Sequence, residues 1–472
     1  MNKYYITSAI PYVNAMPHIG HALEFIQADT IRRYKILQGF DAKLLCGSDE
    51  NALKNVQSAE KAGMPTQEFI DKNALLFENL AKKLNVQFDF FQKGSNDNHH
   101  LASQKLWSMC KKEDIYKKNY KGLYCLGCEE FKSITDLNSN SECPEHPGKN
   151  LDEIEEENYF FALSKYQDQL LDIIGSGLYS ITPEFRKNEI ISFIKSGLND
   201  FSISRSNLRA KNWGVQVPVD LNQRIYVWFD ALNIYQSGIG FGWDEKLYDR
   251  WWPADLHVIG KGIIRFHAIY WPAILLSAGL KLPKALFVHE YFTVNGQKMS
   301  KTLGNVIDPV DLVNRFGTDA LRYYCLSKIS PFQDGDFSEE KLRDAYNADL
   351  ANGLGNLVAR VAKLCQLNDV VINSIKEEKI EKVEIYLNEF KFNLALEEIW
   401  KHIKQLDVRI NFDKPWEIKD KNTLQGYLIQ YVSILQVIAY NLQPFLPQTS
   451  EKIKKLFEGP NITPGESLFP RI

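Results

Sequence analysis

Two histidines near the start of the chain are suited to binding a polyphosphate. The segment His18-Ile19-Gly20-His21 follows a short apolar stretch and opens a run of apolar residues with helical spacing. A helix start of this kind offers an anion its backbone N–H groups, the helix dipole and two imidazole donors, and Gly20 permits close backbone approach. An ordinary loop at the start of a helix is the alternative interpretation.

Two lysines much later in the chain form a second candidate for the same chemistry. The segment Lys298-Met299-Ser300-Lys301-Thr302 lies between Gly296 and Gly304, a composition typical of a mobile loop. Its two cations can close over a polyphosphate and stabilise the charge that develops as pyrophosphate leaves. An exposed basic turn is the alternative interpretation.

Three of the seven cysteines and one histidine have the spacing of metal ligands. Cys125 and Cys128 are separated by two residues, as are Cys143 and His146, with 14 residues between the pairs. Two such pairs facing each other give a tetrahedral Cys₃His site, which is closed and has no position for a catalytic water. The pattern predicts one structural zinc ion, and unrelated buried thiols are the alternative.

The elements around these motifs predict a doubly wound nucleotide-binding sheet. Lys3–Ile10 is rich in strand-forming residues, the apolar spacing from Gly20 to Leu37 predicts a helix, and Ala42–Cys46 predicts a second strand. After a helical pattern over 51–83 and a long stretch without periodicity, further strands are predicted at 159–163, 224–230, 254–259 and 287–294. The nucleotide-binding domain is therefore predicted to be split by an insertion. Amphipathic patterns then predict a helix bundle at 339–367, 380–408, 421–442 and 448–457.

Composition limits the classes of protein to which the chain can belong. Its 472 residues suit about three domains of roughly 150 residues each. A net charge of -3 and a pI near 6.4 exclude a wholly basic surface, so contact with nucleic acid must depend on local patches and shape. The sequence shows no secretion or import signal, and its apolar runs are shorter than the ~20 residues that cross a bilayer. With an odd number of cysteines, we expect a cytoplasmic protein without membrane association.

The histidine and lysine segments, in this order and about 280 residues apart, resemble the two signatures of class I aminoacyl-tRNA synthetases. Five further segments narrow the resemblance to the methionyl-tRNA synthetase family and extend it over essentially the whole chain. They are Ala9-Ile10-Pro11-Tyr12, Asp200-Phe201-Ser202-Ile203-Ser204-Arg205, Tyr226-Val227-Trp228-Phe229-Asp230-Ala231, Phe266-His267 with Trp271-Pro272-Ala273, and Val294-Asn295-Gly296-Gln297 before the second signature.

The resemblance implies a class I Rossmann-type parallel sheet, α/β in class, split by a zinc-bearing insertion and followed by an α-helical anticodon-binding bundle. It assigns 1–112 to the first half of the catalytic domain and 113–215 to the inserted module with the zinc knuckle. It assigns 216–335 to the second half with a region contacting the tRNA stem, and 336–472 to the anticodon-binding domain.

The resemblance also implies an activity. L-methionine would react with ATP to give methionyl-adenylate and pyrophosphate, and the methionyl group would pass to the 2′-hydroxyl of the terminal adenosine of tRNA(Met). Because a carboxylate is already ionised at pH 7, positioning and charge stabilisation, with Mg²⁺ bound to ATP, should supply most of the catalysis. The implied catalytic residues are His18, His21, Lys298 and Lys301, and the ATP-binding set adds Gly20, Lys261 and Ser300.

A methionine pocket follows from the same resemblance. Asp49 would hold the ammonium group, and the walls would comprise Ile10, Tyr12, Trp228, Ala231, Leu232, Tyr235, Ile263, Phe266 and His267. Aromatic walls suit a polarizable thioether, and Tyr12 and His267 can donate weak hydrogen bonds to its sulfur. Ordinary core packing is the alternative for the aromatic residues.

Three residues of the predicted bundle match those with which the family reads the CAU anticodon. Asn356 and Arg360 lie four apart on one predicted helix and share a face, and Trp416 lies in a turn. Amide and guanidinium groups can bond to base edges, and an indole can stack on a splayed base.

Two positions depart from the family pattern. Asn51-Ala52 stands where His-Gly is common, and Gly262 follows Lys261 where Asp is common, which puts polar contacts to the adenylate in doubt. Another class I synthetase and a catalytically silent tRNA-binding relative therefore remain as alternatives. The chain ends where some members continue into a β-barrel, so we expect a monomer.

Overall fold

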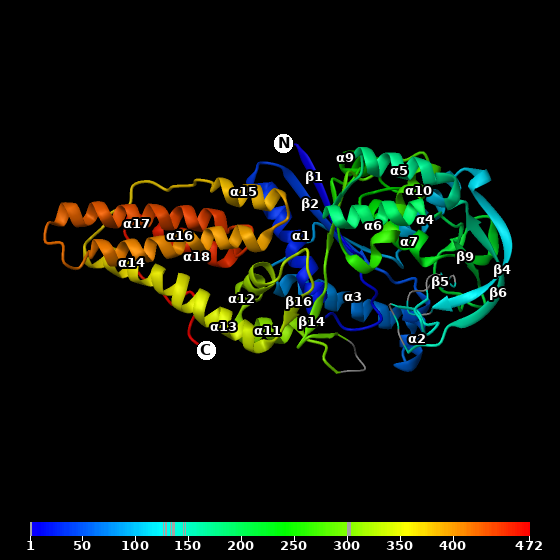
Figure 1. Ribbon diagram of the computed structural model, residues 1–472, viewed down its shortest axis with the longest axis horizontal. Coiled ribbons are helices and arrows are strands. Elements are labelled where there is room, and N and C mark those ends of the chain that lie inside the picture. The colour runs from blue at the N-terminus through cyan, green and yellow to red at the C-terminus, as the bar shows by residue number, and fades with distance from the viewer. Residues whose placement is uncertain are drawn as a thin grey trace. The chain divides into compact units, whose positions relative to one another are not determined.

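Six parallel strands form the largest sheet of the computed structural model, which describes residues 2–125, 127, 130–132, 134, 137–144, 146, 148–299 and 304–472. In spatial order they are β3 (Phe90–Lys93), β2 (Asp41–Ser48), β1 (Lys3–Ser8), β12 (Leu256–Gly260), β13 (Ala285–His289) and β7 (Ser180–Thr182). Figure 1 labels β1 and β2 of this sheet. Ile6 pairs with Leu44 on one side and Leu256 on the other. The doubly wound α/β sheet predicted from the sequence is therefore confirmed, with β1 and β12, whose paired residues are 250 positions apart in the chain, as neighbours.

The chain divides into two compact units. The first, here called the sheet unit, comprises Met1–Pro17, Phe40–Asn79 and Gln87–His289. The second, the helical unit, comprises His18–Gly39, Leu80–Val86 and Glu290–Ile472. The two predicted signatures both belong to the helical unit, whereas the predicted methionine-pocket residues all belong to the sheet unit.

Helices complete the sheet unit. They are α2 (Leu53–Lys61), α3 (Thr66–Lys83, which continues into the helical unit), α4 (Asp97–Met109), α5 (Gln167–Ser176), α6 (Glu184–Lys195), α7 (Val227–Leu232), α8 (Ile234–Ser237), α9 (Glu245–Trp251) and α10 (Trp271–Ser277). Single turns of 3-10 helix lie at Lys112–Asp114, Leu163–Tyr166 and Lys261–Ile263, and a π-helical turn at Phe266–Tyr270. Within the described part of the chain, no helix is long and apolar enough to cross a membrane.

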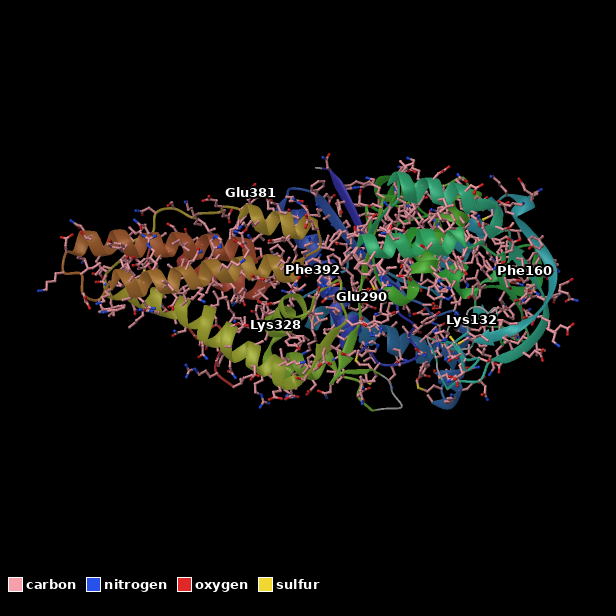
Figure 2. The ribbon with its side chains drawn as sticks, viewed as in Figure 1. Lys132, Phe160, Glu290, Lys328, Glu381 and Phe392 are labelled. Carbon is pink, nitrogen blue, oxygen red and sulfur yellow. The ribbon has the colours of Figure 1, made fainter. Side chains whose placement is uncertain are left out.

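Two antiparallel sheets also belong to the sheet unit. One has the order β5 (Glu130–Lys132), β4 (Ile115–Cys125), β6 (Asp152–Phe161) and β8 (Phe201–Ser202). The other has the order β10 (Gln216–Val217), β11 (Asp220–Ile225) and β9 (Ser204–Ser206). Phe160 of β6, labelled in Figure 2, packs its ring against Tyr116 and Tyr120 of β4. Cys125, the last residue of β4, is one of the predicted metal ligands.

Two sequence predictions differ from the structure here. The strand predicted at 224–230 is wrong beyond Ile225, because α7 begins at Val227. Every residue of α7 is buried, and an apolar run buried on all sides has no periodicity that distinguishes helix from strand. In addition, β7 lies within the range expected for the inserted module but pairs with β13 in the parallel sheet. The domain boundaries themselves stay predictions.

The helical unit begins with α1 (Ile19–Leu37), which was predicted from Gly20. A small sheet has the order β15 (Gln297–Lys298), β14 (Phe292–Val294) and β16 (Gly335–Phe337). The helices are α11 (Pro309–Phe316), α12 (Thr318–Tyr323), α13 (Glu339–Ala345), α14 (Asn356–Leu367), α15 (Glu381–Asn388), α16 (Phe392–Asp413), α17 (Lys421–Leu442) and α18 (Pro447–Phe457), with π-helical segments at Tyr324–Lys328 and Tyr346–Gly355. The predicted C-terminal helix bundle is thereby confirmed.

Candidate functional site

The candidate site in the sheet unit includes residues at the carboxyl ends of three neighbouring parallel strands. Tyr12, Asp49 and Lys261 follow β1, β2 and β12. Tyr12 and Asp49 form a parallel backbone bridge, and the Asp49 N–H donates to the Pro11 carbonyl at 2.9 Å. Ligands of open α/β sheets bind at this edge, beside the strand where the order reverses. The fold therefore brings together residues that are more than 200 positions apart.

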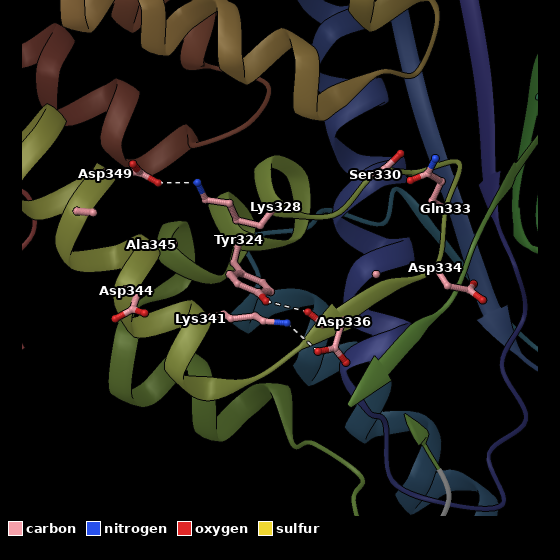
Figure 3. A pocket seen from close by; sticks show the side chains of 12 residues that line it. Tyr324, Lys328, Ser330, Gln333, Asp334, Asp336, Lys341, Asp344, Ala345 and Asp349 are labelled. Atoms are coloured by element: carbon pink, nitrogen blue, oxygen red, sulfur yellow. Dashed lines mark hydrogen bonds and ion pairs between the residues drawn. The ribbon is translucent and has the colours of Figure 1, made fainter. Parts of the chain in front are cut away.

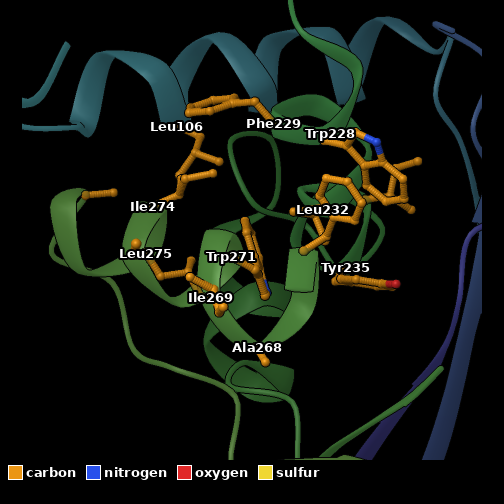
Figure 4. Packing of buried hydrophobic residues seen from close by; sticks show 14 of the residues in the cluster. Leu106, Trp228, Phe229, Leu232, Tyr235, Ala268, Ile269, Trp271, Ile274 and Leu275 are labelled. Atoms are coloured by element: carbon orange, nitrogen blue, oxygen red, sulfur yellow. The ribbon is translucent and has the colours of Figure 1, made fainter. Parts of the chain in front are cut away.

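An aromatic wall adjoins Tyr12. The rings of Trp228 on α7 and Phe266 are stacked with centroids 3.7 Å apart and an interplanar angle of 7°, and Tyr12 meets Trp228 edge-on at 6.1 Å. Figure 4 shows Trp228, Leu232 and Tyr235 within the apolar cluster of this unit. Of the other predicted pocket residues, Ala231 and Leu232 are buried, and Ile10 and Ile263 pack half-buried against the same cluster.

His267 is held in one tautomer. Burial lowers its pKa to about 4, so the ring is neutral near pH 7. Its Nδ1 lies 2.9 Å from the Ile263 carbonyl oxygen, and its Nε2 lies 2.7 Å from the Tyr235 hydroxyl. Only a ring protonated on Nδ1 satisfies both, donating to Ile263 and accepting from Tyr235. The expected N–H donation from His267 to a thioether sulfur is therefore wrong, because its one ring proton is already used.

The first signature caps its own helix. His18 Nδ1 accepts from the Gly20 N–H at 3.1 Å, and His21 Nδ1 accepts from the His18 N–H at 3.1 Å, so that the two imidazoles form a capping box. The two rings lie 3.9 Å apart. Burial and the neighbouring His18 keep the pKa of His21 well below its ordinary value. Because each Nδ1 accepts, the proton of each neutral ring resides on Nε2.

This arrangement changes the predicted anion-binding groups. The N–H groups of Ile19 and His21 donate to the carbonyls of Ile307 and His18, so all four N–H groups from residue 18 to residue 21 are used within the chain. The expectation that they bind the anion is wrong, and the imidazole Nε2–H groups and the helix dipole supply the positive potential. A Cβ on Gly20 would lie 2.9 Å from His18 Cε1, so the glycine makes room for that ring.

The second signature begins on a tight hairpin. β14 and β15 are joined by Asn295 and Gly296, whose φ angles of 51° and 73° are those of a two-residue turn with left-handed backbone. Asp336 of β16 accepts from the Gly296 N–H at 2.7 Å and from the Thr293 hydroxyl at 2.8 Å. The Lys341 ammonium group, 2.7 Å away, and these donors lower the pKa of Asp336 to about 2. The hairpin is thus fixed to β16 by a carboxylate that is ionised near neutral pH.

The two signatures meet within the helical unit. Met299 Cε lies 3.7 Å from the position that a Cβ on Gly20 would occupy, and the Ile19 N–H reaches Ile307 beyond the second signature. Lys298 pairs through its backbone with Thr293. Ser300 and Lys301, predicted to bind ATP, lie outside the described residues. The prediction that the two segments serve one ligand is therefore compatible with their proximity.

A cavity of about 640 Å³ lies beside β16 and α13 (Figure 3). Two ion pairs, Lys341 with Asp336 and Lys328 with Asp349, span part of its wall at 2.7 and 2.8 Å. The remaining charged side chains of its lining are Asp334 and Asp344. Four carboxylates against two ammonium groups give the lining a net negative charge, which disfavours binding of a polyanion there.

Three of the four predicted metal ligands converge at the end of β4. The ligand atoms of Cys125, Cys143 and His146 all lie within 4.8 Å of one another. His146 Nδ1 is 3.8 Å from Cys125 Sγ and 4.0 Å from Cys143 Sγ, close to the about 3.6 Å edge of a tetrahedron with zinc–ligand bonds. A Cβ on Gly127 would overlap the His146 ring. The donor set fits a metal ion, while Cys128 lies outside the described residues.

The predicted anticodon residues lie on the helix bundle. The Arg360 guanidinium is 5.2 Å from the Trp416 ring centroid, and Trp416 is 55% exposed in the turn after α16. Arg360 also donates to Asn411 at 2.7 Å and pairs with Asp407 at 3.2 Å. Asn356 is exposed one helical turn before Arg360 on α14. The bundle thus presents amide, guanidinium and indole groups on one surface.

Several residues of the site escaped the sequence analysis. Asp336 bonds to the hairpin before the second signature, and Asp407 and Asn411 bond to Arg360, but none of these three residues belongs to a motif. Asp230 belongs to a motif, but the sequence analysis gave it no role. The spacing of Asp407 and Asn411, four apart on a helix, shows that they share a face but not which partner they meet.

Comparison with known proteins identifies the family of the chain. The family model described as tRNA synthetases class I (M) matches residues 4–154 and 146–362. A methionine--tRNA ligase of Mycobacterium bovis is 38% identical over 505 residues, which cover 100% of this chain and 97% of the relative. The chain belongs to the methionyl-tRNA synthetase family.

Other members of the methionyl-tRNA synthetase family support this assignment. A methionine--tRNA ligase of Thermotoga maritima is 41% identical and covers 96% of this chain and 74% of its own length. The solved structure of Mycobacterium tuberculosis methionyl-tRNA synthetase in complex with methionyl-adenylate is 37% identical, with a TM-score of 0.92 over 100% of both chains. The two departures from the family pattern, Asn51-Ala52 and Gly262, therefore occur in a chain that has the fold of the family.

Proposed function

We propose that this chain is a methionine--tRNA ligase, which forms methionyl-adenylate from L-methionine and ATP and transfers the methionyl group to the 2′-hydroxyl of the terminal adenosine of tRNA(Met). The full-length likeness to a synthetase solved with methionyl-adenylate carries the proposal. The fold class, the enzyme class and the family all agree with it.

The sheet unit would bind methionine. The Asp49 carboxylate would pair with the ammonium group, and the stacked Trp228 and Phe266 rings with Tyr12 would pack against the thioether. His267 would serve as an apolar wall, since its single ring proton is donated to Ile263. Discrimination against branched amino acids would then depend on the shape of this wall.

The helical unit would bind ATP. The Nε2–H groups of His18 and His21 would donate to phosphate oxygens, and Lys298 and Lys301 would neutralise the charge of departing pyrophosphate. Gly20 and Ser300 would complete these contacts, and Lys261 stays a predicted ATP ligand. Mg²⁺ would arrive with ATP and neutralise part of its charge. Because the attacking methionine carboxylate is ionised near pH 7, no residue has to accept a proton in this step.

Zinc and tRNA would engage other parts of the chain. We propose that Cys125, Cys128, Cys143 and His146 hold one structural Zn²⁺, for which the described ligand distances are suitable. We propose that Asn356, Arg360 and Trp416 read the anticodon. Thiolate ligands require a reducing compartment, which supports the cytoplasm as the location. The monomeric state stays a prediction.

Exchange of labelled pyrophosphate into ATP tests the proposed first step. The purified chain, assayed with each amino acid in turn, should support exchange with methionine above all others. Stronger exchange with another amino acid would instead favour a different class I specificity, and absence of exchange with all of them would favour a catalytically silent relative.

A further inference from the structure

One buried carboxylate beside the proposed methionine pocket has no role in the function proposed above. Asp230 lies on α7 between Trp228 and Ala231 and is 2% exposed. Its Oδ1 is 2.8 Å from His99 Nε2 and 2.8 Å from Ser103 Oγ, both on α4. Burial alone would raise the pKa of Asp230, but the neighbouring His99 and its hydrogen bonds outweigh burial and lower it. The group is therefore an ionised acceptor of several hydrogen bonds.

The other oxygen of Asp230 meets Asn51, one of the two departures from the family pattern. Asn51 Nδ2 lies 2.6 Å from Asp230 Oδ2 and 2.7 Å from the carbonyl oxygen of Gly94. An amide nitrogen carries two hydrogens, so Asn51 satisfies both acceptors at once. The side-chain amide of Asn51 therefore donates one hydrogen bond to Asp230 and one to Gly94.

Asn51 in turn belongs to the segment that carries Asp49. The backbone of Asp49 is fixed on one side by its N–H, which donates to the Pro11 carbonyl, and on the other by its carbonyl, which accepts from Asn55 Nδ2 at 2.9 Å. Asn51 lies two residues after Asp49, and Asp230 lies two residues after Trp228. The hydrogen bond between Asn51 and Asp230 therefore ties the segment of the proposed ammonium ligand to the helix of the proposed thioether wall.

We propose that Asp230, acting through Asn51, is a positioning residue that sets the spacing between Asp49 and Trp228 and thereby the affinity for methionine. The inference rests on the proposed function. Methionine would contact both segments at the same time, one through its ammonium group and the other through its side chain. A displacement between the two segments would weaken one contact or the other, whereas ATP contacts of the helical unit would be unaffected.

The substitution Asp230→Asn tests this in the full chain. An asparagine there is uncharged and has a single acceptor oxygen, so it cannot accept from Asn51 on one side and from His99 and Ser103 on the other at the same time. In methionine-dependent pyrophosphate exchange, the KM for methionine should rise about tenfold or more, since hydrogen bonds to buried charges are strong. The KM for ATP should stay within about twofold of the unsubstituted chain.

A matched control is available in the same unit. Asp114 is also 2% exposed and accepts hydrogen bonds from the hydroxyls of Tyr166 and Ser277, and no hydrogen bond or ion pair found among the described residues joins its carboxylate to Asn51 or α7. Asp114→Asn should reduce stability while leaving both KM values unchanged. The proposal is overturned if Asp230→Asn changes both KM values equally, changes kcat alone, or behaves as Asp114→Asn does.

A second variant covers the case in which Asp230→Asn fails to fold. Asn51→Ala removes the donor and leaves Asp230 with its partners on α4, and the KM for methionine should rise about three- to tenfold. An unchanged KM for methionine in this variant overturns the inference. If the unsubstituted chain shows no methionine-dependent exchange, the proposed function itself fails. If that chain is active and neither variant shifts the KM for methionine, only the positioning role fails.

Discussion

Nη1 of Arg322 lies 2.9 Å from Oδ2 of Asp29, and both side chains are fully buried. The same guanidinium donates to the carbonyls of Phe445 at 2.7 Å and Pro444 at 3.0 Å. Asp29 lies on α1, the helix that begins with the first signature, and Phe445 lies between α17 and α18. One buried cation therefore joins the signature helix to the C-terminal helices of the same unit.

Replacing Arg322 by leucine should strongly destabilise the helical unit. The substitution leaves the Asp29 carboxylate and the two carbonyls buried without this donor, and loss of one partner of a buried ion pair typically costs about 3–5 kcal/mol of unfolding free energy. Urea unfolding followed by far-UV circular dichroism measures the change. Arg315→Leu is the control, because Arg315 pairs with Glu339 on the exposed surface and its loss should have little effect. Equal losses in both variants would contradict the account.

Stability should fall in mild acid because His267 is buried in its neutral form. Its pKa is lowered to about 4 in the folded chain, whereas the unfolded chain binds a proton near pH 6.5. The buried, neutral His267 therefore makes its full contribution to the unfolding free energy above pH 6.5. This contribution is lost as the pH falls from 6.5 toward 4, by about 3 kcal/mol in total. His267→Gln should flatten the dependence of the unfolding free energy on pH over this range. If the unfolding free energy of His267→Gln depends on pH as steeply as that of the unsubstituted chain, folding does not lower the pKa of His267.

Gly20→Ala should impair adenylate formation without unfolding the chain. The added methyl group would lie 2.9 Å from His18 Cε1 and would displace the imidazole that caps α1. A shift of about 1 Å in a positioning group can reduce the rate a hundredfold, so kcat of pyrophosphate exchange should fall at least about tenfold. Gly426→Ala on α17, where nothing lies within 4 Å of the new methyl, should leave the rate unchanged. Full activity of Gly20→Ala would contradict the proposed packing.

Cys143→Ser should abolish metal binding. A serine hydroxyl does not replace a thiolate in a structural zinc site, so the zinc content should fall from about one to near zero per chain. Metal analysis of the purified protein gives the stoichiometry. The control is Cys365→Ser, which replaces a buried cysteine of α14 that is not among the predicted ligands and should retain the metal. Equal zinc in both variants would disprove the ligand set.

Four strands of the parallel sheet, β1, β2, β12 and β13, lie within or overlap stretches that the sequence predicted as strands, because these stretches are apolar between clear breakers, whereas the short β3 and β7 were not predicted. Helix α7 was not predicted either. Its residues Val227–Leu232 are buried on every side, so their sequence has no periodicity that distinguishes a helix from a strand. Local signals also placed α1 and α17 within one residue of their observed bounds.

The sequence predicted those residues of the candidate site that belong to recognisable motifs. Hydrogen-bond direction was not: the acceptor role of Nδ1 in His18 and His21 depends on the three-dimensional arrangement of the helix start. The same holds for His267, whose tautomer is set by Tyr235 and Ile263, and for Asn51, whose partner Asp230 lies 179 residues away. The sequence shows which donor and acceptor groups are present, whereas the three-dimensional structure shows which of their atoms are already hydrogen-bonded within the chain.

Charging of tRNA tests the central claim most directly. The purified chain, given ATP, labelled methionine and a tRNA with a CAU anticodon, should form methionyl-tRNA, whereas the same tRNA ending in 2′-deoxyadenosine should remain uncharged. Trp416→Ala should retain pyrophosphate exchange and lose most of the charging, because it removes the exposed indole beside Arg360. Charging of this tRNA with an amino acid other than methionine, or exchange without any charging by the unsubstituted chain, would contradict the account.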